Sequence, residues 1–287
     1  MASTTSSSNN APPPYLTQIH VRPYRNSDFE ETRKTFLDML VGGRCTYLRS
    51  THKHLKPSLD ESPFTLAMQK QFTTPLSLIS YSITLFGLLV LLFLANSVAT
   101  RNIGIVLSLI GPSTFFYSRY TLRSVFNQYR ERILTGDLAD IGKHYHLVDT
   151  SLNGNGNGNG DVATSKGKSG FWVAEAVQQG GKPEVVGCVG LDANTNKDET
   201  SAELRRLVIS PKYRRRGIAQ QLIRTVVQFA HEHEIQSIFL TTSSYQQPAI
   251  NMYKKLGFDL KEIKEVSIQM QTFKIYAFNL NVDNYKV

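Results

Sequence analysis

The sequence predicts an α/β domain in which a mixed sheet is flanked by helices and interrupted by a hydrophobic insertion. Short segments with strand periodicity alternate with amphipathic helical segments along most of the 287 residues. A single charged residue, Arg101, occurs among the 48 residues from Gln71 to Ser118. The chain is long enough to bury a sizeable core around the sheet.

The N-terminal part combines a polar tail with the first elements of the domain. Residues 1–16 are rich in Ser, Thr, Asn and Pro, a composition that predicts a disordered tail. Residues 18–25, QIHVRPYR, alternate as a strand does, and residues 26–28 offer caps for a helix that ends near Leu40. We therefore expect the first strand, the first helix and a basic linker within residues 17–70.

The hydrophobic insertion, residues 71–118, contains two segments with the composition of membrane helices. Residues 75–96 can cross a hydrocarbon core of about 30 Å, and residues 102–118 lie near the lower length limit. Basic residues flank the insertion on both sides, and they favour the cytoplasmic side of a membrane. We expect a transmembrane helical hairpin between the first two helices of the domain, with its turn near residues 96–102 on the far side. A single crossing and a buried helix of a soluble core are the alternatives.

The remainder, residues 119–287, is expected to form the rest of the domain. The repeated Asn-Gly of residues 153–160 predicts a flexible surface insertion over residues 150–169. Strand patterns occupy residues 171–177, 184–193, 202–210, 237–243 and 273–282. Helical patterns occupy residues 121–134, 137–148, 218–230 and 248–258.

Charge and cysteine content limit the partners. The net charge of +9 (32 basic minus 23 acidic residues) favours an anionic partner, such as phosphate, nucleic acid or an acidic lipid surface. Two cysteines, Cys45 and Cys188, do not make a disulfide framework, so a reducing compartment is expected. Neither cysteine has the spacing of paired metal ligands, and histidines two residues apart do not share a helix face. The sequence therefore predicts no metal site.

The stretch RRRGIA follows a strand and precedes a helix, and this position favours phosphate binding. The first backbone N–H groups of a helix have no partner within it, and the helix dipole adds positive potential there. Gly217 allows a ligand to approach the backbone closely, and Ala219 keeps the next approach small. The predicted pyrophosphate site comprises Arg214, Arg215, Arg216, Gly217, Ile218, Ala219 and Gln220.

A basic patch for nucleic acid is the alternative function of this stretch. Six basic residues and no acidic residue occur between Leu204 and Gly217. However, no aromatic motif for base stacking accompanies them, and a nuclear protein is not expected to carry a membrane hairpin. We therefore expect no nucleic-acid partner.

Arg214, Gly217 and Ala219 form an R-x-x-G-x-A pattern that resembles the acyl-CoA pyrophosphate loop of the GNAT acetyltransferase superfamily. The late helical segment AINMYKKLGF is also similar to the GNAT helix whose tyrosine faces the CoA sulfur, and Tyr253 falls on that position. The order of strands and helices resembles the GNAT fold. This resemblance implies acetyl-CoA as the acetyl donor.

A closer resemblance is to the membrane-bound camello-like branch, which includes aspartate and cysteine S-conjugate N-acetyltransferases. It rests on the hydrophobic insertion and on the segments GDLADI, GFWVAE and VVGCVG, at residues 136–141, 170–175 and 185–190. The match covers roughly residues 19–278. It implies an N-acetyltransferase at the endoplasmic reticulum.

The resemblance implies roles for four further residues. Glu203 matches the position at which some GNAT members place a general base, although a solvated carboxylate or a partner of Arg205 is an equal alternative. Tyr253 is expected to be the general acid; packing in the core is the alternative. Backbone N–H groups around Leu207 and Ile209 are expected to bind the acetyl oxygen and the pantetheine arm. Many GNAT members carry Asn where this sequence has Gln246.

Arg205 and Arg206 are the candidate substrate-binding residues. As neighbours on a strand, they are expected to point to opposite faces, so that one can pair with a substrate carboxylate. Arg206 matches an arginine of the aspartate-acetylating members. Asp137 and Asp140 either bind an ammonium group or cap a helix.

The sequence thus predicts a membrane-anchored N-acetyltransferase that acts on the α-amino group of a small amino acid or derivative, with aspartate favoured and the catalytic domain cytoplasmic. A cysteine S-conjugate or a protein lysine is the alternative acceptor. A non-catalytic module that binds acyl-CoA at the membrane is the alternative from another class. The oligomeric state is not predicted.

Overall fold

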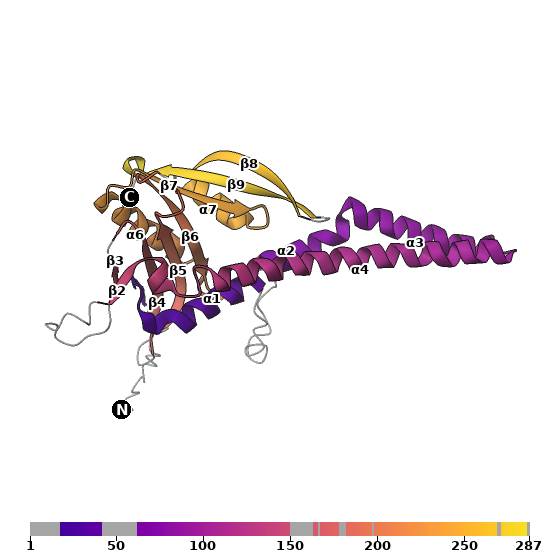
Figure 1. The fold of residues 1–287 in the computed structure, drawn as a ribbon, viewed down its shortest axis with the longest axis horizontal. Helices are drawn as coiled ribbons and strands as arrows, with labels where there is room; N and C mark the ends of the chain where they lie inside the picture. The colour runs from indigo at the N-terminus through magenta and orange to yellow at the C-terminus, as the bar shows by residue number, and fades with distance from the viewer. Residues whose placement is uncertain are drawn as a thin grey trace, which may run out of the picture.

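The computed structural model describes residues 18–41, 62–149, 163–165, 167–177, 182–196, 198–268 and 271–285. The chain forms an α/β domain from which a long pair of helices extends (Figure 1). The predicted tail at residues 1–16, most of the basic linker and the Asn-Gly segment at residues 153–160 lie outside the described residues.

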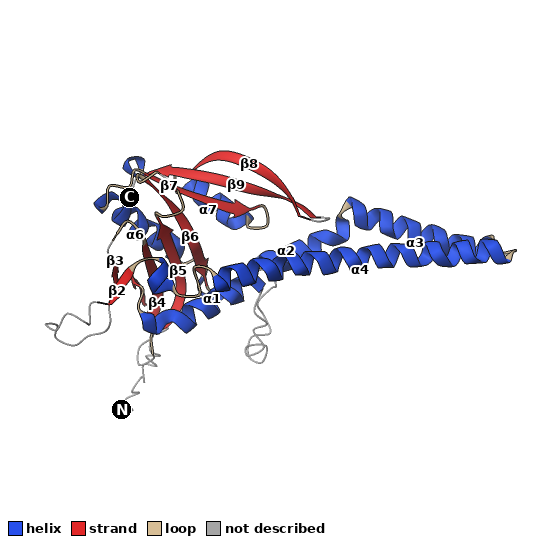
Figure 2. Cartoon of the chain, in the orientation of Figure 1, coloured by secondary structure: helices blue, strands red, loops and turns tan. Residues whose placement is uncertain are grey.

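The main sheet has seven strands in the order β1-β4-β5-β6-β7-β9-β8 (Figure 2). Strands β6 and β7 are parallel, and the other neighbours are antiparallel. The sheet is therefore mixed, as predicted; β2 and β3 form a separate antiparallel pair. The strands are β1 (Gln18–Pro23), β2 (Leu147–Asp149), β3 (Ala163–Ser165), β4 (Gly170–Val177), β5 (Glu184–Asp192), β6 (Ser201–Ile209), β7 (Ser237–Ser243), β8 (Asp259–Ile268) and β9 (Gln271–Asn281).

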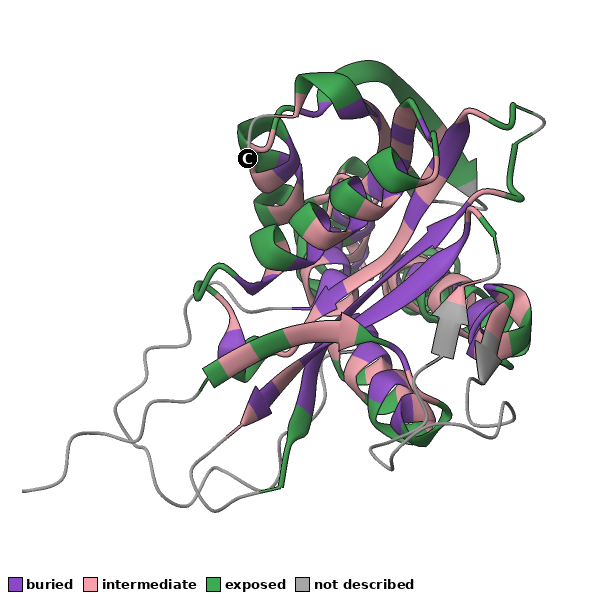
Figure 3. Cartoon of the chain, turned by 90° about the vertical axis from the view of Figure 1, so that its left-hand side faces the viewer, coloured by how far each residue is buried: buried purple, intermediate pink, exposed green. Residues whose placement is uncertain are grey.

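Helices cover both faces of this sheet. They are α1 (Phe29–Val41), α2 (Pro63–Lys70), α3 (Pro75–Phe93), α4 (Val98–Thr135), α5 (Ile141–His144), α6 (Ile218–Glu232) and α7 (Gln247–Lys255). One core cluster contains buried residues of α6 and α7, and a second contains those of α1, α5 and the end of α4. The central strands between these two layers are mostly buried (Figure 3).

Helix α6 shows how the sequence pattern produces the packing. Its apolar residues recur every three or four positions and form one face that lies on the sheet. The buried residues of this face are Ile218, Leu222, Ile223, Val226, Val227 and Ala230. The helix begins at the predicted place, directly after Gly217.

The hydrophobic insertion forms two paired helices, α3 and α4 (Figure 1). They approach closely because glycines lie between them: a Cβ at Gly87 would meet the backbone of Ser108, and a Cβ at Gly104 would meet the side chain of Leu91. By length and composition, one helix in the described part of the chain, α3, could cross a membrane. The first half of α4 also exposes large apolar side chains, among them Val98, Ile103, Val106, Leu109 and Phe116.

Three features differ from the predicted elements. The turn between the two long helices occupies residues 94–97, and α4 then continues without a break to Thr135, so the second hairpin helix is also the second major helix of the domain. Residues 137–148 were expected to be helical, but only Ile141–His144 form a helix, and a strand begins at Leu147. Strand β3, which lies within the insertion expected at residues 150–169, and strand β8 have no counterpart among the predicted strands.

Candidate active site

The connection between β6 and α6 forms an open backbone cradle. Gly217, the N-cap residue of α6, has a φ of +77°, and no side chain caps the helix. Arg215 also has a positive φ of +61°. Successive turns of this kind direct backbone N–H groups to one point, where an anion can bind. A Cβ at Gly217 would meet no atom within 4 Å, so the space above the cradle is open.

Strands β6 and β7 separate beside this cradle. Their pairing is confined to Ser201–Glu203 of β6 and Ser237–Phe239 of β7, although β7 continues to pair with β9 as far as Ser243. From Leu204 onward, the backbone of β6 is therefore not paired with β7 along the edge that faces it. Leu207 and Ile209, the residues expected to bind the pantetheine arm, lie in this part of β6.

A β-bulge at Arg206 changes the direction of the side chains of Arg205 and Arg206, the two candidate substrate-binding residues. The register between β5 and β6 shifts between Cys188 and Gly190, and Arg206 has a φ of +56°. Because the bulge adds a residue, Arg205 and Arg206 both point toward the face covered by α1 and α5, where they pair with Asp192 and Asp137. The prediction that they point to opposite faces is wrong for this reason.

Arg206 forms a two-point ion pair with Asp137, which follows the end of α4. Its Nε and Nη2 atoms lie 2.6 and 2.7 Å from the two carboxylate oxygens. Burial by itself would raise the pKa of Asp137, but the hydrogen bonds and charge of Arg206 lower it overall. The Tyr145 hydroxyl donates to the same carboxylate at 3.2 Å. Asp140, the other candidate for an ammonium group, caps α5 by accepting from the Lys143 N–H.

Arg205 belongs to a second charged group on the same face. Its Nη1 atom lies 3.0 Å from Asp192 Oδ2, and His144 Nε2 lies 2.9 Å from that same oxygen. Glu203 Oε2 is 3.6 Å from Arg205 Nε, beyond hydrogen-bond distance. The pKa of Glu203 is raised, first because burial disfavours the charged carboxylate. Glu203 is thus a partly buried carboxylate paired with Arg205, which is the alternative considered beside the role of general base.

Tyr253 lies in α7 on the opposite face of the sheet. The side chain is 6% exposed, and its ring packs against Phe258 and Phe278. Burial raises the pKa of its hydroxyl strongly, so the group is protonated at neutral pH. A protonated hydroxyl can act as an acid, and the ring also contributes to the core. Gln246 accepts a 2.6 Å hydrogen bond from Thr242 at the start of this helix.

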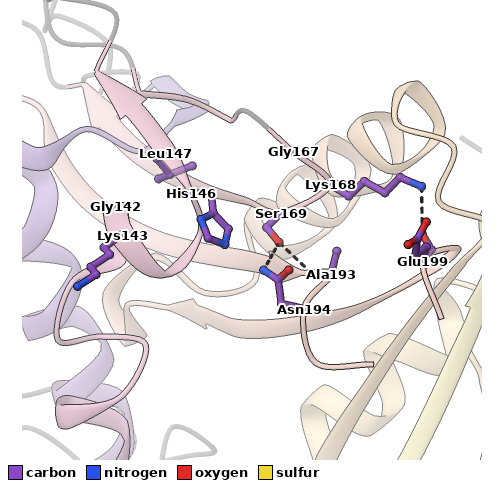
Figure 4. A pocket seen from close by; sticks show the side chains of 10 residues that line it. All are labelled: Gly142, Lys143, His146, Leu147, Gly167, Lys168, Ser169, Ala193, Asn194 and Glu199. Atoms are coloured by element: carbon purple, nitrogen blue, oxygen red, sulfur yellow. Dashed lines mark hydrogen bonds between the residues drawn. The ribbon is translucent and has the colours of Figure 1, made fainter. Parts of the chain in front are cut away.

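A cavity of about 700 Å³ lies away from the cradle, beside the connection between β5 and β6. Its lining includes His146, Lys168, Ser169, Asn194 and Glu199 (Figure 4). Ser169 and Asn194 hydrogen-bond to each other, and Lys168 donates to the Glu199 carbonyl. None of the predicted site residues lines it. Within the described residues, no cluster of three or more His, Cys, Asp or Glu has the arrangement of a metal site.

Sequence reasoning did not assign roles to Asp192 and Tyr145, and it did not recognise Asp137 as the partner of Arg206. These residues are 8 to 69 positions away from the groups that they contact. For the two aspartates, the sequence offered one indication, which was their charge. Asp192 ends an apolar strand, and Asp137 lies within the GDLADI segment.

Comparison with known proteins agrees with this geometry. Residues 147–258 match the family model described as the acetyltransferase (GNAT) family. The chain is 30% identical to mouse N-acetyltransferase 8F1 over 85% of this chain and 87% of that protein. It is 29% identical to human N-acetyltransferase 8B, over 85% of each chain. It is also 24% identical to the probable N-acetyltransferase camello of Xenopus tropicalis, over 93% of this chain and 99% of that protein.

These matches confirm the predicted family. The open cradle and the separated strands fit acetyl-CoA, since the cradle offers N–H groups for the pyrophosphate and the uncovered edge of β6 offers backbone groups for the pantetheine arm. Acetyl-CoA is the acetyl donor of this enzyme. The chain belongs to the GNAT acetyltransferases, in the group of the N-acetyltransferase 8 and camello proteins.

Proposed function

We propose that this acetyltransferase is anchored in a membrane and acetylates the α-amino group of a small amino acid or amino-acid derivative. The observation that carries the transfer reaction is the open cradle at Gly217 beside the uncovered edge of β6. The catalytic domain would lie on the cytoplasmic face, and the resemblance to the camello-like branch favours the endoplasmic reticulum.

The residues of the cradle would bind the donor. Backbone N–H groups of Gly217, Ile218, Ala219 and Gln220 would surround the pyrophosphate at the N-terminus of α6. Arg214, Arg215 and Arg216 would add positive charge near the phosphates. The thioester of acetyl-CoA supplies the electrophilic carbonyl when the donor is bound.

Two side chains and one backbone group would carry the proton transfers and stabilise charge. Glu203 would remove a proton from the acceptor ammonium, directly or through a water molecule, because its raised pKa makes it a better base. The N–H of Leu207, or of a neighbour at the bulge, would stabilise the negative charge that develops on the acetyl oxygen. Tyr253 would donate its proton to the departing thiolate.

Aspartate, an acidic amino acid, is our proposed acceptor, and the ion pairs of the two arginines favour one of them as the ligand of its side-chain carboxylate. Arg206 is held at two points by Asp137 and is 11% exposed. Among the described residues, Arg205 makes one side-chain hydrogen bond, to Asp192, and a longer ion pair with Glu203, and its side chain is 26% exposed. Arg205 therefore has donors left for a substrate carboxylate, which makes it the better candidate.

Helices α3 and α4 would form the membrane anchor. Helix α3 has 19 residues, which corresponds to about 28 Å at 1.5 Å per residue, and exposes large apolar side chains along most of its length. The paired first half of α4 is also apolar on its exposed surface. Two crossings would place the basic residues at both ends of the hairpin on one side of the membrane.

Thiol release from acetyl-CoA by the detergent-solubilised protein tests the proposal. Aspartate, S-benzylcysteine and a lysine-containing peptide would be supplied in turn as acceptors. Release with aspartate, reduced by Arg205→Gln through a higher KM, would support the proposed acceptor. Release only with S-benzylcysteine or with the peptide would replace aspartate by a cysteine conjugate or a protein lysine. Binding of acetyl-CoA without release from any amine would contradict the proposed reaction.

A further inference from the structure

Asp192 contacts both His144 and Arg205 in the charged group beside Glu203, the candidate base. It ends β5, directly opposite Glu203 in the register between β5 and β6. Its side chain is 2% exposed, and one of its oxygens, Oδ2, lies close to both His144 and Arg205. A buried carboxylate with two cationic or hydrogen-bonding partners has a fixed position.

Arg205 has two possible carboxylate partners, and it is bound to one of them. Its Nη1 atom is 3.0 Å from Asp192, a hydrogen-bond distance, whereas its Nε atom is 3.6 Å from Glu203. This second contact is an ion pair without a hydrogen bond. A hydrogen-bonded pair between Arg205 and Glu203 would stabilise the charged carboxylate further and make it a weaker base. The contact with Asp192 therefore limits Arg205 to the longer ion pair with Glu203, without a hydrogen bond.

The other charged groups around Glu203 are already paired. Arg206 is bound at two points by Asp137, and its charge lowers the pKa of Glu203 less than the charge of Arg205 does. Thr195, in the connection after β5, can hydrogen-bond to the Glu203 carboxylate. His144 of α5 faces Asp192, and the Tyr145 hydroxyl faces Asp137. Arg205 is thus the cation that can move relative to Glu203 and thereby change the pKa of the Glu203 carboxylate.

We propose that Asp192, together with His144, is a positioning residue of the transfer site: it holds Arg205 so that its ion pair with Glu203 stays at 3.6 Å without a hydrogen bond, and so keeps the Glu203 carboxylate available as the base. This inference rests on the proposed role of Glu203. When Asp192 loses its charge, Arg205 turns to Glu203 and the base is weakened. The arrangement also keeps the donors of Arg205 that do not face Asp192 directed toward the acceptor.

The test is the pH dependence of kcat/KM for acetyl transfer, measured with the full-length protein in detergent. In the unaltered enzyme, kcat/KM rises with pH as Glu203 loses its proton. Asp192→Asn removes a negative charge and frees Arg205, and both effects lower the pKa of Glu203. We expect the midpoint of this rise to move down by about one pH unit or more and the plateau to fall by about tenfold.

Arg205→Gln supplies a second variant if Asp192→Asn does not fold. It removes the cation, so we expect the midpoint to move up in pH, even where the variant also raises KM for an acidic acceptor. The double variant Asp192→Asn with Arg205→Gln is expected to reverse the downward shift. Asp198→Asn is the matched control, because Asp198 is an exposed carboxylate in the same connection that contacts Thr200.

The outcomes separate the inference from the proposed function. If Glu203→Gln removes the rise with pH but neither Asp192→Asn nor Arg205→Gln moves its midpoint, Glu203 is the base and the positioning role is wrong. If the rise persists in Glu203→Gln, another group is the base, and both assignments are wrong. A shift in Asp198→Asn equal to that in Asp192→Asn would show a general charge effect and overturn the role of Asp192.

Discussion

Arg206 and Asp137 join the bulge of β6 to the end of α4 through a nearly buried ion pair with two hydrogen bonds, at 2.6 and 2.7 Å. The Arg206 guanidinium also lies over the ring of Phe36 in α1, 5.5 Å from its centroid. The backbone oxygen of Arg206 accepts a hydrogen bond from the Cys188 thiol. Three elements therefore fix the strained residue of the bulge, beside which the acetyl group would be bound.

Asp137→Asn should destabilise the catalytic domain by about 3 kcal/mol, because it leaves a buried guanidinium without its counter-charge. Chemical denaturation in detergent, followed by tryptophan fluorescence of Trp172, would measure the change. Asp259→Asn is the control, since Asp259 forms an exposed ion pair with Lys261 and should leave the stability unchanged. Equal stability of both variants would show that the ion pair contributes little.

The ion pair between Arg206 and Asp137 should make the free energy of unfolding depend on pH in the acid range. Asp137 has a folded-state pKa below its ordinary value of 3.8, so its contribution is fully present above that pH. It is lost as the pH falls through the lower folded-state pKa. We expect the free energy of unfolding to fall more steeply below pH 4 in the unaltered protein than in Asp137→Asn. Parallel curves for the two proteins would contradict this assignment.

Tyr253→Phe should lower kcat by about a hundredfold while the affinity for acetyl-CoA is retained. The fold should be kept because the ring packs against Phe258 and Phe278 without the hydroxyl. Steady-state thiol release and calorimetric titration with acetyl-CoA would measure the two quantities. Tyr285→Phe removes a partly buried hydroxyl elsewhere and should have no effect on kcat. Unchanged turnover in Tyr253→Phe would remove this residue as the acid.

Gly217→Ala should raise the KM for acetyl-CoA by about tenfold or more, because the added methyl group occupies the open space of the cradle. The strain of a positive φ should also reduce stability by about 1 kcal/mol. Gly257→Ala is a matched control, since Gly257 has a φ of +86° and lies after α7. It should show the loss of stability without the change in KM. Equal KM changes in both variants would mean that strain alone is responsible.

A glycosylation acceptor inserted into the turn at residues 94–97 should be modified in microsomes if both long helices cross the membrane. The same acceptor placed at residues 198–200 should stay unmodified, because that connection belongs to the catalytic domain. A shift in electrophoretic mobility that is reversed by glycosidase measures the modification. An unmodified turn would contradict the proposed hairpin topology.

The elements with strong periodicity could be predicted from the sequence, and the long-range contacts could not. The apolar face of α6 and the cradle at Gly217 depend on neighbouring residues, so a local pattern was sufficient. The bulge at Arg206 was missed because strict strand alternation assumes that no residue is inserted. Strand β8 was missed because its exposed edge position permits many charged residues, which obscures the alternation.

The site was predicted in part for a similar reason. Glu203 was assigned from the resemblance, and Arg205 and Arg206 from their neighbouring places on a strand together with the resemblance; the structure brings all three to one face. Their partners, Asp137 and Asp192, come from α4 and β5, and only the tertiary fold determines which carboxylate each arginine contacts. Asp137 was considered as a ligand for an ammonium group, whereas the fold pairs it with an internal cation.

Helix α4 has a mechanical consequence for a protein anchored as we propose. It continues for 38 residues from the turn of the hairpin to Thr135, two residues before Asp137. An uninterrupted helix transmits rotation along its axis, at about 100° for each added residue, instead of absorbing it. One residue inserted between Ser118 and Asn127 would therefore turn the membrane helices relative to the catalytic face, and it would also displace Leu122 and Phe126 from their contacts with α2.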